Sequence, residues 1–254
     1  MHNADNPDVI AEYVQLEGEN GTLGGYLAKP AGKGPYPGVL VIHDIYGITD
    51  HTKKVAQDLA KEGFVGLSVN LVSRSLGIDF PGGSDEVKES LKQLADADAM
   101  SDLDAGLAYL KKEPVVFTNS VGCMGFCMGG RFSLLFGAHN KDIKAVVAFY
   151  GPPIDKEVSP KYPQAAIDLV PEIEAPVLGN YGTEDHVIPV ENVLKFEEKL
   201  RKHNKVFDIK IYPGAKHGFH KEGPSYHAEA ANDAWKRTIN WFKKYLKTYK
   251  QGKT

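Results

Sequence analysis

Cys127 lies in the sequence Gly125-Phe-Cys-Met-Gly129, which is the segment of this chain that most clearly indicates a catalytic nucleophile. A G-x-C-x-G pattern between a predicted strand and a predicted helix is typical of a sharp turn that presents a nucleophile. The glycines are needed because the turn is strained and side chains beside it would collide with the strand or helix. The amino end of the following helix favours a thiolate, and the backbone N–H of Met128 is placed to bind an oxyanion. Cys127 is therefore the candidate nucleophile, whereas Cys123 lies inside the predicted strand as a packed thiol.

A thiol nucleophile needs a general base, and the base needs an orienting group. In triads built on this turn, the order along the chain is nucleophile, acid, histidine. Asp185 lies 58 residues after Cys127, and His217 lies 32 residues after Asp185, each just beyond a predicted strand. Glu184 competes for the acid role and His220 for the base role. We favour Asp185 because a short apolar segment ending in proline follows it, and His217 because it comes sooner after its strand and precedes a glycine.

A third loop, His43-Asp-Ile-Tyr-Gly47, follows a short apolar strand. In folds with this nucleophile turn, the corresponding loop donates a second oxyanion N–H, and Ile45 is the expected donor. Asp44 is a carboxylate placed to meet the thiol or its surroundings, and a simple turn residue is an equally good interpretation. His217 and His220 are too sparse a pair to predict a metal site, and no cysteine or carboxylate motif completes one.

These candidates need a scaffold that brings strand ends together, and the apolar pattern predicts one. Strands are expected over residues 10–16, 22–28, 37–43, 64–69, 119–126, 143–150, 176–181 and 207–212. Helices are expected over about 51–62, from Ser101, over 128–138, from Pro189, and around 235–246, with an irregular loop at 79–85 bordering the cleft. Strands that alternate with helices indicate an α/β protein with a mostly parallel central sheet and helices on both faces. Functional loops on such a sheet lie at the carboxyl ends of its strands.

The amino-acid composition further limits the class of protein to which this chain can belong. The chain has 254 residues with 33 acidic and 30 basic side chains, and 42% of its residues are apolar. We expect one domain over residues 1–254, with no disulfide framework because there are only two cysteines. The net charge of −3 argues against a nucleic-acid partner, and no apolar run of about 18 residues predicts a membrane span. Residues 1–7 lack the basic and apolar regions of a signal peptide, so we expect a cytoplasmic protein. Nothing in the pattern specifies an oligomeric state.

Four segments together resemble the dienelactone hydrolase family of α/β-hydrolases. They are His43-Asp-Ile-Tyr-Gly47, Gly125-Phe-Cys-Met-Gly-Gly130, Gly182-Thr-Glu-Asp185 and Lys216-His-Gly-Phe219, and the resemblance spans about residues 10–248. It implies a three-layer α/β-hydrolase fold, no cofactor, and a Cys127–His217–Asp185 triad that forms an acyl-enzyme. The implied substrates are small esters and lactones, including the enol-lactone formed in bacterial breakdown of catechols (carboxymethylenebutenolidase activity).

The chain departs from the family's pattern at two places. The best-known members carry Glu, which holds the resting thiol, where this chain has Asp44. The family also binds the substrate carboxylate with arginines, and Arg74 falls near one such position, although a solvated loop cation is the alternative interpretation. After His217, this chain has His220 and Lys221 where an arginine is expected. Asp44, Tyr46 and Arg74 are thus the candidates for supporting the site or binding substrate.

Two other functions remain open from the sequence. The same triad suits a thioesterase or an acyltransferase, which substrate profiling distinguishes from a lactonase. Alternatively, Cys127 is a redox-reactive thiol in a protein that binds or senses without turnover. The second alternative leaves Asp185 and His217 unexplained.

Overall fold

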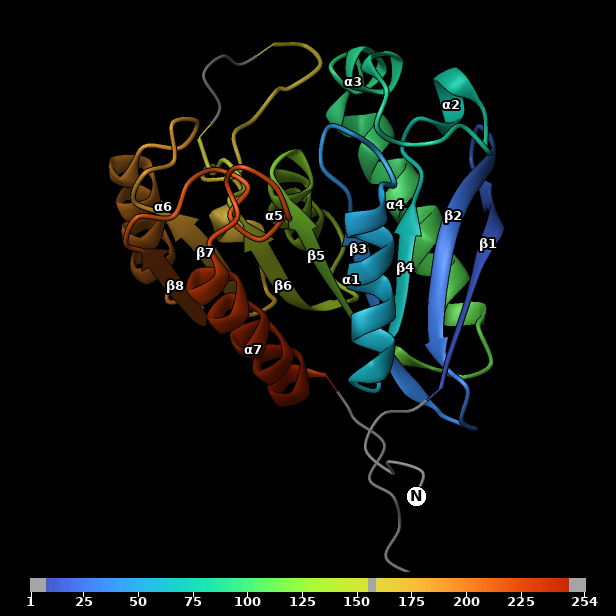
Figure 1. The fold of residues 1–254 in the computed structure, drawn as a ribbon. Coiled ribbons are helices and arrows are strands. Elements are labelled where there is room, and N and C mark those ends of the chain that lie inside the picture. The colour runs from blue at the N-terminus through green and yellow to red at the C-terminus, as the bar shows by residue number, and fades with distance from the viewer. Residues whose placement is uncertain (1–7, 155–158, 247–254) are drawn as a thin grey trace, which may run out of the picture.

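The structure, a computed structural model, describes residues 8–154 and 159–246. Residues 1–7, on which the expectation of no signal peptide depends, lie outside the described part. Eight strands form one sheet in the order β1-β2-β4-β3-β5-β6-β7-β8 (Figure 1). The strands are β1 (Val9–Gly18), β2 (Gly21–Pro30), β3 (Tyr36–Ile42), β4 (Val65–Val69), β5 (Val116–Phe126), β6 (Ile143–Phe149), β7 (Val177–Gly182) and β8 (Phe207–Tyr212). The helices are α1 (Asp50–Lys61), α2 (Ser73–Leu76), α3 (Asp85–Leu91), α4 (Asp96–Lys112), α5 (Met128–His139), α6 (Val190–Lys202) and α7 (Ala228–Tyr245), with a 3₁₀ turn at Val170–Glu172.

The sheet is mostly parallel. Strands β3 to β8 run in the same direction, while the β1–β2 hairpin joins the edge through an antiparallel pairing of β2 with β4. All five residues of β4 are buried, as are six of the seven in β3. Continuous apolar runs suit these strands because both faces of the sheet are covered. The predicted α/β-hydrolase fold with a mostly parallel sheet is confirmed.

Helices cover the two faces in separate layers. Helices α1 and α7 lie on one face, and α4, α5 and α6 lie on the other (Figure 1). The apolar stripe of α1 packs through Val55 and Leu59, and that of α7 through Ile239 and Phe242, into one core cluster. Phe132 and Phe136 of α5 belong to the second cluster, on the opposite face. The expected three-layer arrangement follows from these amphipathic faces.

The predicted helix start at Ser101 is wrong. Helix α4 begins at Asp96, and Ser101 lies in its second turn, where its hydroxyl bonds Arg74 and Glu19. The earlier start is stabilised by tertiary contact, because Arg131 of α5 binds both oxygens of Asp96 at 2.6 and 2.9 Å. A long-range partner of this kind leaves no local capping signal.

Two short helices between β4 and α4 were not expected from the sequence. The irregular loop predicted at 79–85 ends at Ser84, whose hydroxyl accepts from the Val87 N–H at 3.2 Å and begins α3. The parallel strands all point their carboxyl ends to the upper edge in Figure 1. The loops after β3, β5, β7 and β8 therefore lie at the same edge of the sheet.

Candidate active site

Cys127 lies at the junction of β5 and α5 in a strained backbone conformation. Its φ is 54° and its ψ is −118°, a region that residues other than glycine rarely adopt. Its N–H donates to the carbonyl of Phe149 at 3.0 Å, and its own carbonyl accepts from the Arg131 N–H at 3.1 Å. Bonds to β6 on one side and α5 on the other hold this half-buried residue at the carboxyl edge of the sheet.

Close backbone approach explains the glycines of the turn. A Cβ atom at Gly125 would lie 2.0 Å from the carbonyl oxygen of Gly129. A Cβ atom at Gly129 would lie 2.2 Å from the carbonyl oxygen of Ile42, at the end of β3. The first turn of α5 therefore packs directly against the end of β3, which brings the loop containing Ile45 next to Met128.

The two predicted oxyanion donors lie at this junction. Met128 is the first residue of α5, and helix geometry gives its N–H no partner within the helix. Ile45 lies in a turn that the Gly47 N–H closes by donating to the carbonyl of Asp44 at 3.2 Å. The positive end of the α5 dipole acts at the same place. The location meets the requirement for an oxyanion site, and the donor role of each N–H stays a prediction.

Asp185 and His217 form a hydrogen bond between the loops after β7 and β8. His217 Nδ1 lies 2.8 Å from Asp185 Oδ2. The other carboxylate oxygen accepts from the N–H groups of Val187 and Ile188 at 2.8 and 2.9 Å. Asp185 is buried, so its four lone-pair directions are largely used by these three donors. The bond fixes the ring so that Nε2 is the nitrogen left for chemistry.

The environment of His217 favours its charged form. Burial alone lowers the pKa of this ring, but the hydrogen bond to Asp185 and the nearby Cys127 sulfur raise it to about 10. Nε2 is buried and makes no hydrogen bond within the described residues. The Cys127 sulfur raises this pKa both as a hydrogen-bonding partner and through its charge. A protonated His217 at neutral pH supplies a positive charge beside the sulfur.

The two competitors lie elsewhere. His220 Nδ1 is 3.1 Å from His51 Nε2, and its ring packs 5.3 Å from Phe126. Glu184 is exposed, whereas the neighbouring Asp185 is buried against the imidazole. These contacts favour Asp185 over Glu184 and separate His220 from the candidate triad.

Asp44 pairs with a lysine in the loop after β8. Its Oδ1 accepts from the Tyr46 N–H at 2.8 Å, and its Oδ2 lies 3.1 Å from Lys221 Nζ. The Lys221 ammonium also stands 4.7 Å from the centre of the Tyr46 ring. Asp44 thus closes its own turn and binds the cation that the sequence placed near the candidate base. The sequence marked each residue but contains no signal that joins positions so far apart in the chain.

Arg74 is already paired in the structure. Its guanidinium lies 2.6 Å from Asp102, a fully buried carboxylate of α4, and a nitrogen donates to Ser101 at 3.2 Å. These contacts anchor α2 to α4. They do not involve the triad, and a role for Arg74 in substrate binding stays a prediction.

Tyr150 is a site residue that sequence reasoning missed. It directly follows β6, has a φ of 38°, and its ring packs 5.1 Å from the ring of His217. Burial raises its pKa well above 10, with further contributions from Asp44, Cys127 and Asp185, so its hydroxyl stays protonated. A buried aromatic ring therefore packs against the imidazole of the candidate base. Its position after a strand, before Gly-Pro, was the available signal.

The described residues contain no group of three or more His, Cys, Asp or Glu side chains that is arranged to hold a metal ion. Among the same residues, no helix is long and apolar enough to cross a membrane.

A cysteine at a strained strand-to-helix turn, with a histidine and an aspartate after later strands of a parallel sheet, defines an α/β-hydrolase. The model of the dienelactone hydrolase family matches residues 23–246. The chain belongs to the dienelactone hydrolase family, a family of hydrolases.

Individual relatives agree with this assignment. A Methylorubrum extorquens protein named "Putative carboxymethylenebutenolidase" is 38% identical over 243 residues, which cover 95% of this chain and 83% of that protein. A Bradyrhizobium protein named "Probable 2-oxo-3-(5-oxofuran-2-ylidene)propanoate lactonase" is 32% identical over 222 residues, covering 87% of this chain and 89% of that protein. The crystal structure of a "Putative Dienelactone Hydrolase" from Klebsiella pneumoniae superposes with a TM-score of 0.87 at 31% identity, covering 94% of this chain and all of that one.

Proposed function

We propose that this protein hydrolyses a small carboxylic ester or lactone through an acyl-enzyme on Cys127, with His217 as acid and base and Asp185 as its orienting group. The observation that carries the proposal is the state of His217. Its Nδ1 is bonded to Asp185 at 2.8 Å, and its pKa is raised to about 10 by that bond and by Cys127 against the effect of burial. The names of the relatives, a carboxymethylenebutenolidase and a lactonase, support the substrate class.

The reaction begins with a thiolate on Cys127 and a proton on His217, and this starting state sets the order of the steps. The Cys127 thiolate attacks the carbonyl carbon, and the N–H groups of Met128 and Ile45 stabilise the oxyanion. The intermediate collapses by breaking the bond to the leaving oxygen, which takes the proton from His217 Nε2. Neutral His217 then removes a proton from water as the water attacks the thioester. Expulsion of the thiolate releases the acid and restores the starting pair. Asp185 holds the ring throughout and stabilises its charged form.

Lys221 supports a substrate that carries a carboxylate. Its side chain is one-third exposed, and its ammonium lies beside Asp44, at the start of the loop proposed to bind the oxyanion. A substrate carboxylate near Ile45 would meet this cation, with Tyr46 below it. Lys221→Ala should therefore raise KM for an anionic lactone more than for p-nitrophenyl acetate. Lys88→Ala is the matched control, because Lys88 stands 6.0 Å from the centre of the same Tyr46 ring without an Asp44 contact.

The first experiment is hydrolysis of p-nitrophenyl acetate and of a dienelactone by the wild type and by Cys127→Ala. Turnover of both substrates, reduced by roughly 10³-fold or more in the variant, is expected from the behaviour of other triads. Retention of the esterase rate in Cys127→Ala would refute the proposal. Turnover of the ester alone would keep the triad and reject the lactone. Stoichiometric labelling of Cys127 by iodoacetamide with no turnover would favour the thiol-sensing function.

Thioester hydrolysis and acyl transfer use the same acyl-enzyme. A p-nitrophenyl thioester and an added alcohol acceptor distinguish them, because a transferase partitions the acyl group to the acceptor and a hydrolase to water. Esters and lactones remain the favoured class because the family relatives carry lactonase-type names.

A further inference from the structure

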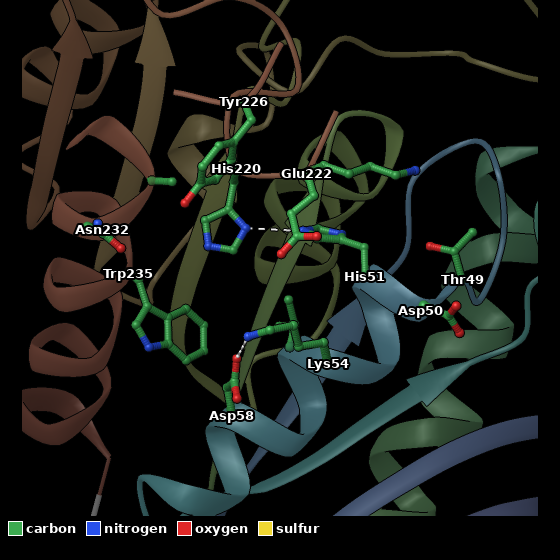
Figure 2. A pocket seen from close by; sticks show the side chains of 13 residues that line it. Thr49, Asp50, His51, Lys54, Asp58, His220, Glu222, Tyr226, Asn232 and Trp235 are labelled. Atoms are coloured by element: carbon green, nitrogen blue, oxygen red, sulfur yellow. Dashed lines mark hydrogen bonds and ion pairs between the residues drawn. The ribbon is translucent and has the colours of Figure 1, made fainter. Parts of the chain in front are cut away.

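A cavity of about 480 Å³ opens between α1 and α7, beneath the loop that follows His217 (Figure 2). None of the three candidate triad residues lines it. The His51–His220 pair forms its inner wall, Trp235 and Asn232 of α7 form one side, and Tyr226 lies above. A cavity of this size, with aromatic walls and a few polar groups, is typical of small-molecule sites.

The histidine pair separates the cavity from the nucleophile. The ring centre of His51 lies 4.7 Å from that of Phe126, and the ring of His220 lies 5.3 Å from it. Phe126 immediately precedes Cys127 and is itself buried. The side of the pair that faces away from Phe126 forms the cavity wall, with the Trp235 ring centre 6.1 Å from that of His220. The cavity therefore excludes the candidate triad but adjoins the candidate active site through this wall and through Lys221, which lines it.

When both rings are neutral, the two ring nitrogens outside the His51–His220 bond comprise one hydrogen-bond donor and one acceptor. Because His51 Nε2 and His220 Nδ1 lie 3.1 Å apart, only one of them carries the hydrogen of the bond between two neutral rings. If His51 donates, His220 Nε2 carries a hydrogen; if His220 donates, its Nε2 is a bare acceptor. Figure 2 shows this second nitrogen of His220 turned away from His51, toward the side of the cavity that α7 forms. A hydroxyl group is a neutral group that pairs with either form, because it both donates and accepts.

The charges around the cavity favour a neutral ligand. Burial lowers the pKa of His220 to about 3 and that of His51 to about 4, so both rings are neutral at pH 7. Lys54 is paired with Asp58 at 2.5 Å, and Lys221 is paired with Asp44 at 3.1 Å. Each lining lysine is thus paired with a carboxylate, and the lining also contains the carboxylates of Asp50 and Glu222, which disfavour an anionic ligand.

We propose that this cavity binds a small planar aromatic compound bearing a hydroxyl group, stacked against Trp235 and hydrogen-bonded to His220 Nε2. The flat walls select an aromatic ring, the two rings of the pair select a hydroxyl, and the lining carboxylates Asp50 and Glu222 select against an anion. This assignment does not depend on the hydrolytic function proposed for Cys127.

The test is a ¹⁹F NMR titration of 4-fluorophenol and of fluorobenzene into the whole protein after Cys127 has been alkylated with iodoacetamide. Alkylation blocks the candidate active site. We expect saturable binding of 4-fluorophenol with a Kd on the order of 1 mM, which suits a ligand of this size. Fluorobenzene should bind about tenfold more weakly, since it lacks one hydrogen bond.

Two variants make the assignment specific. Asn232→Trp fills the cavity from an exposed position of α7 and should abolish saturation, whereas Asn240→Trp, exposed on the same helix outside the cavity, should not. His220→Phe keeps the packing on Phe126 and should reduce the tenfold preference for the phenol to about one. Binding that survives Asn232→Trp, or a preference that survives His220→Phe, would overturn the proposal. Loss of binding on alkylation of the wild type would place the probe at Cys127 and would also overturn it.

Discussion

Replacing Asp185 by Asn tests the candidate triad with the smallest change in shape. In the structure, Oδ1 of Asp185 accepts from the N–H groups of Val187 and Ile188 at 2.8 and 2.9 Å. An asparagine must keep its carbonyl oxygen toward these two donors, because turning the amide would place NH₂ against both. Its NH₂ group then lies where Oδ2 stood, 2.8 Å from His217 Nδ1.

This geometry dictates the consequence for His217. With a donor facing it, Nδ1 must be the bare nitrogen, so the neutral ring carries its hydrogen on Nε2 and cannot accept a proton there. The charged form also loses its partner, and burial then lowers the pKa of the ring from about 10. We expect kcat to fall by roughly 10³- to 10⁴-fold, the scale seen when an orienting carboxylate of another triad becomes an amide. That range corresponds to about 4–5.5 kcal/mol of lost transition-state stabilisation.

The assay is kcat for p-nitrophenyl acetate across pH 5–10, with ¹⁵N NMR of the imidazole to read its tautomer. Glu184→Gln is the matched control, because it removes an adjacent, exposed carboxylate and should leave kcat unchanged. A loss of less than tenfold in Asp185→Asn, or an unchanged Nδ1–H tautomer, would refute the reasoning. Equal losses in both variants would show that loop disruption, and not the tautomer, is the cause.

Three further outcomes follow from contacts in the same region. Asp44→Asn should change the rate at which iodoacetamide alkylates Cys127 by less than about threefold, because both Asp44 oxygens are engaged elsewhere; a large change would contradict this. Gly129→Ala should lower the free energy of unfolding by more than about 3 kcal/mol, as thermal melting would report, whereas Gly38→Ala, whose nearest contacts are side chains at 3.3 Å, should cost less. His220→Phe should weaken the fall in the free energy of unfolding as pH drops below 6.5. The pKa of His220 is lowered to about 3 in the folded state, so the wild type loses about 1.4 kcal/mol per pH unit as pH falls from 6.5 toward 3, and the variant lacks this loss.

The parts of the fold that were predictable depend on local pattern. Continuous apolar runs indicated the parallel strands because both sheet faces are covered, and the G-x-C-x-G pattern indicated the turn because backbone approaches of 2.0 and 2.2 Å exclude any side chain there. The start of α4 was not predictable, since Asp96 is held by Arg131 from another helix. Local capping signals at Ser101 pointed to a different residue.

The parts of the site that were not predictable depend on contacts between distant segments. Asp185 and His217 were found because both follow strands, and the rule that parallel strand ends converge needs only strand positions. Two other pairings, Lys221 with Asp44 and His220 with His51, join the loop after β8 to the segment after β3. No periodicity or motif encodes them, because they result from α1 and that loop packing on the same side of the sheet.

The pairing of Asp44 with Lys221 bears on the consequence of having Asp rather than Glu at this position. The family resemblance implies a glutamate at this position that holds the resting thiol. Here the shorter side chain has both oxygens bound, one to the Tyr46 N–H at 2.8 Å and one to Lys221 at 3.1 Å. The charge that faces the Cys127 sulfur is then that of His217, whose pKa of about 10 reflects Asp185 and the sulfur itself. In the proposed mechanism, thiolate formation depends on the loops after β7 and β8, the loop after β3 binds the oxyanion, and Lys221 in the loop after β8 meets the charge of the substrate.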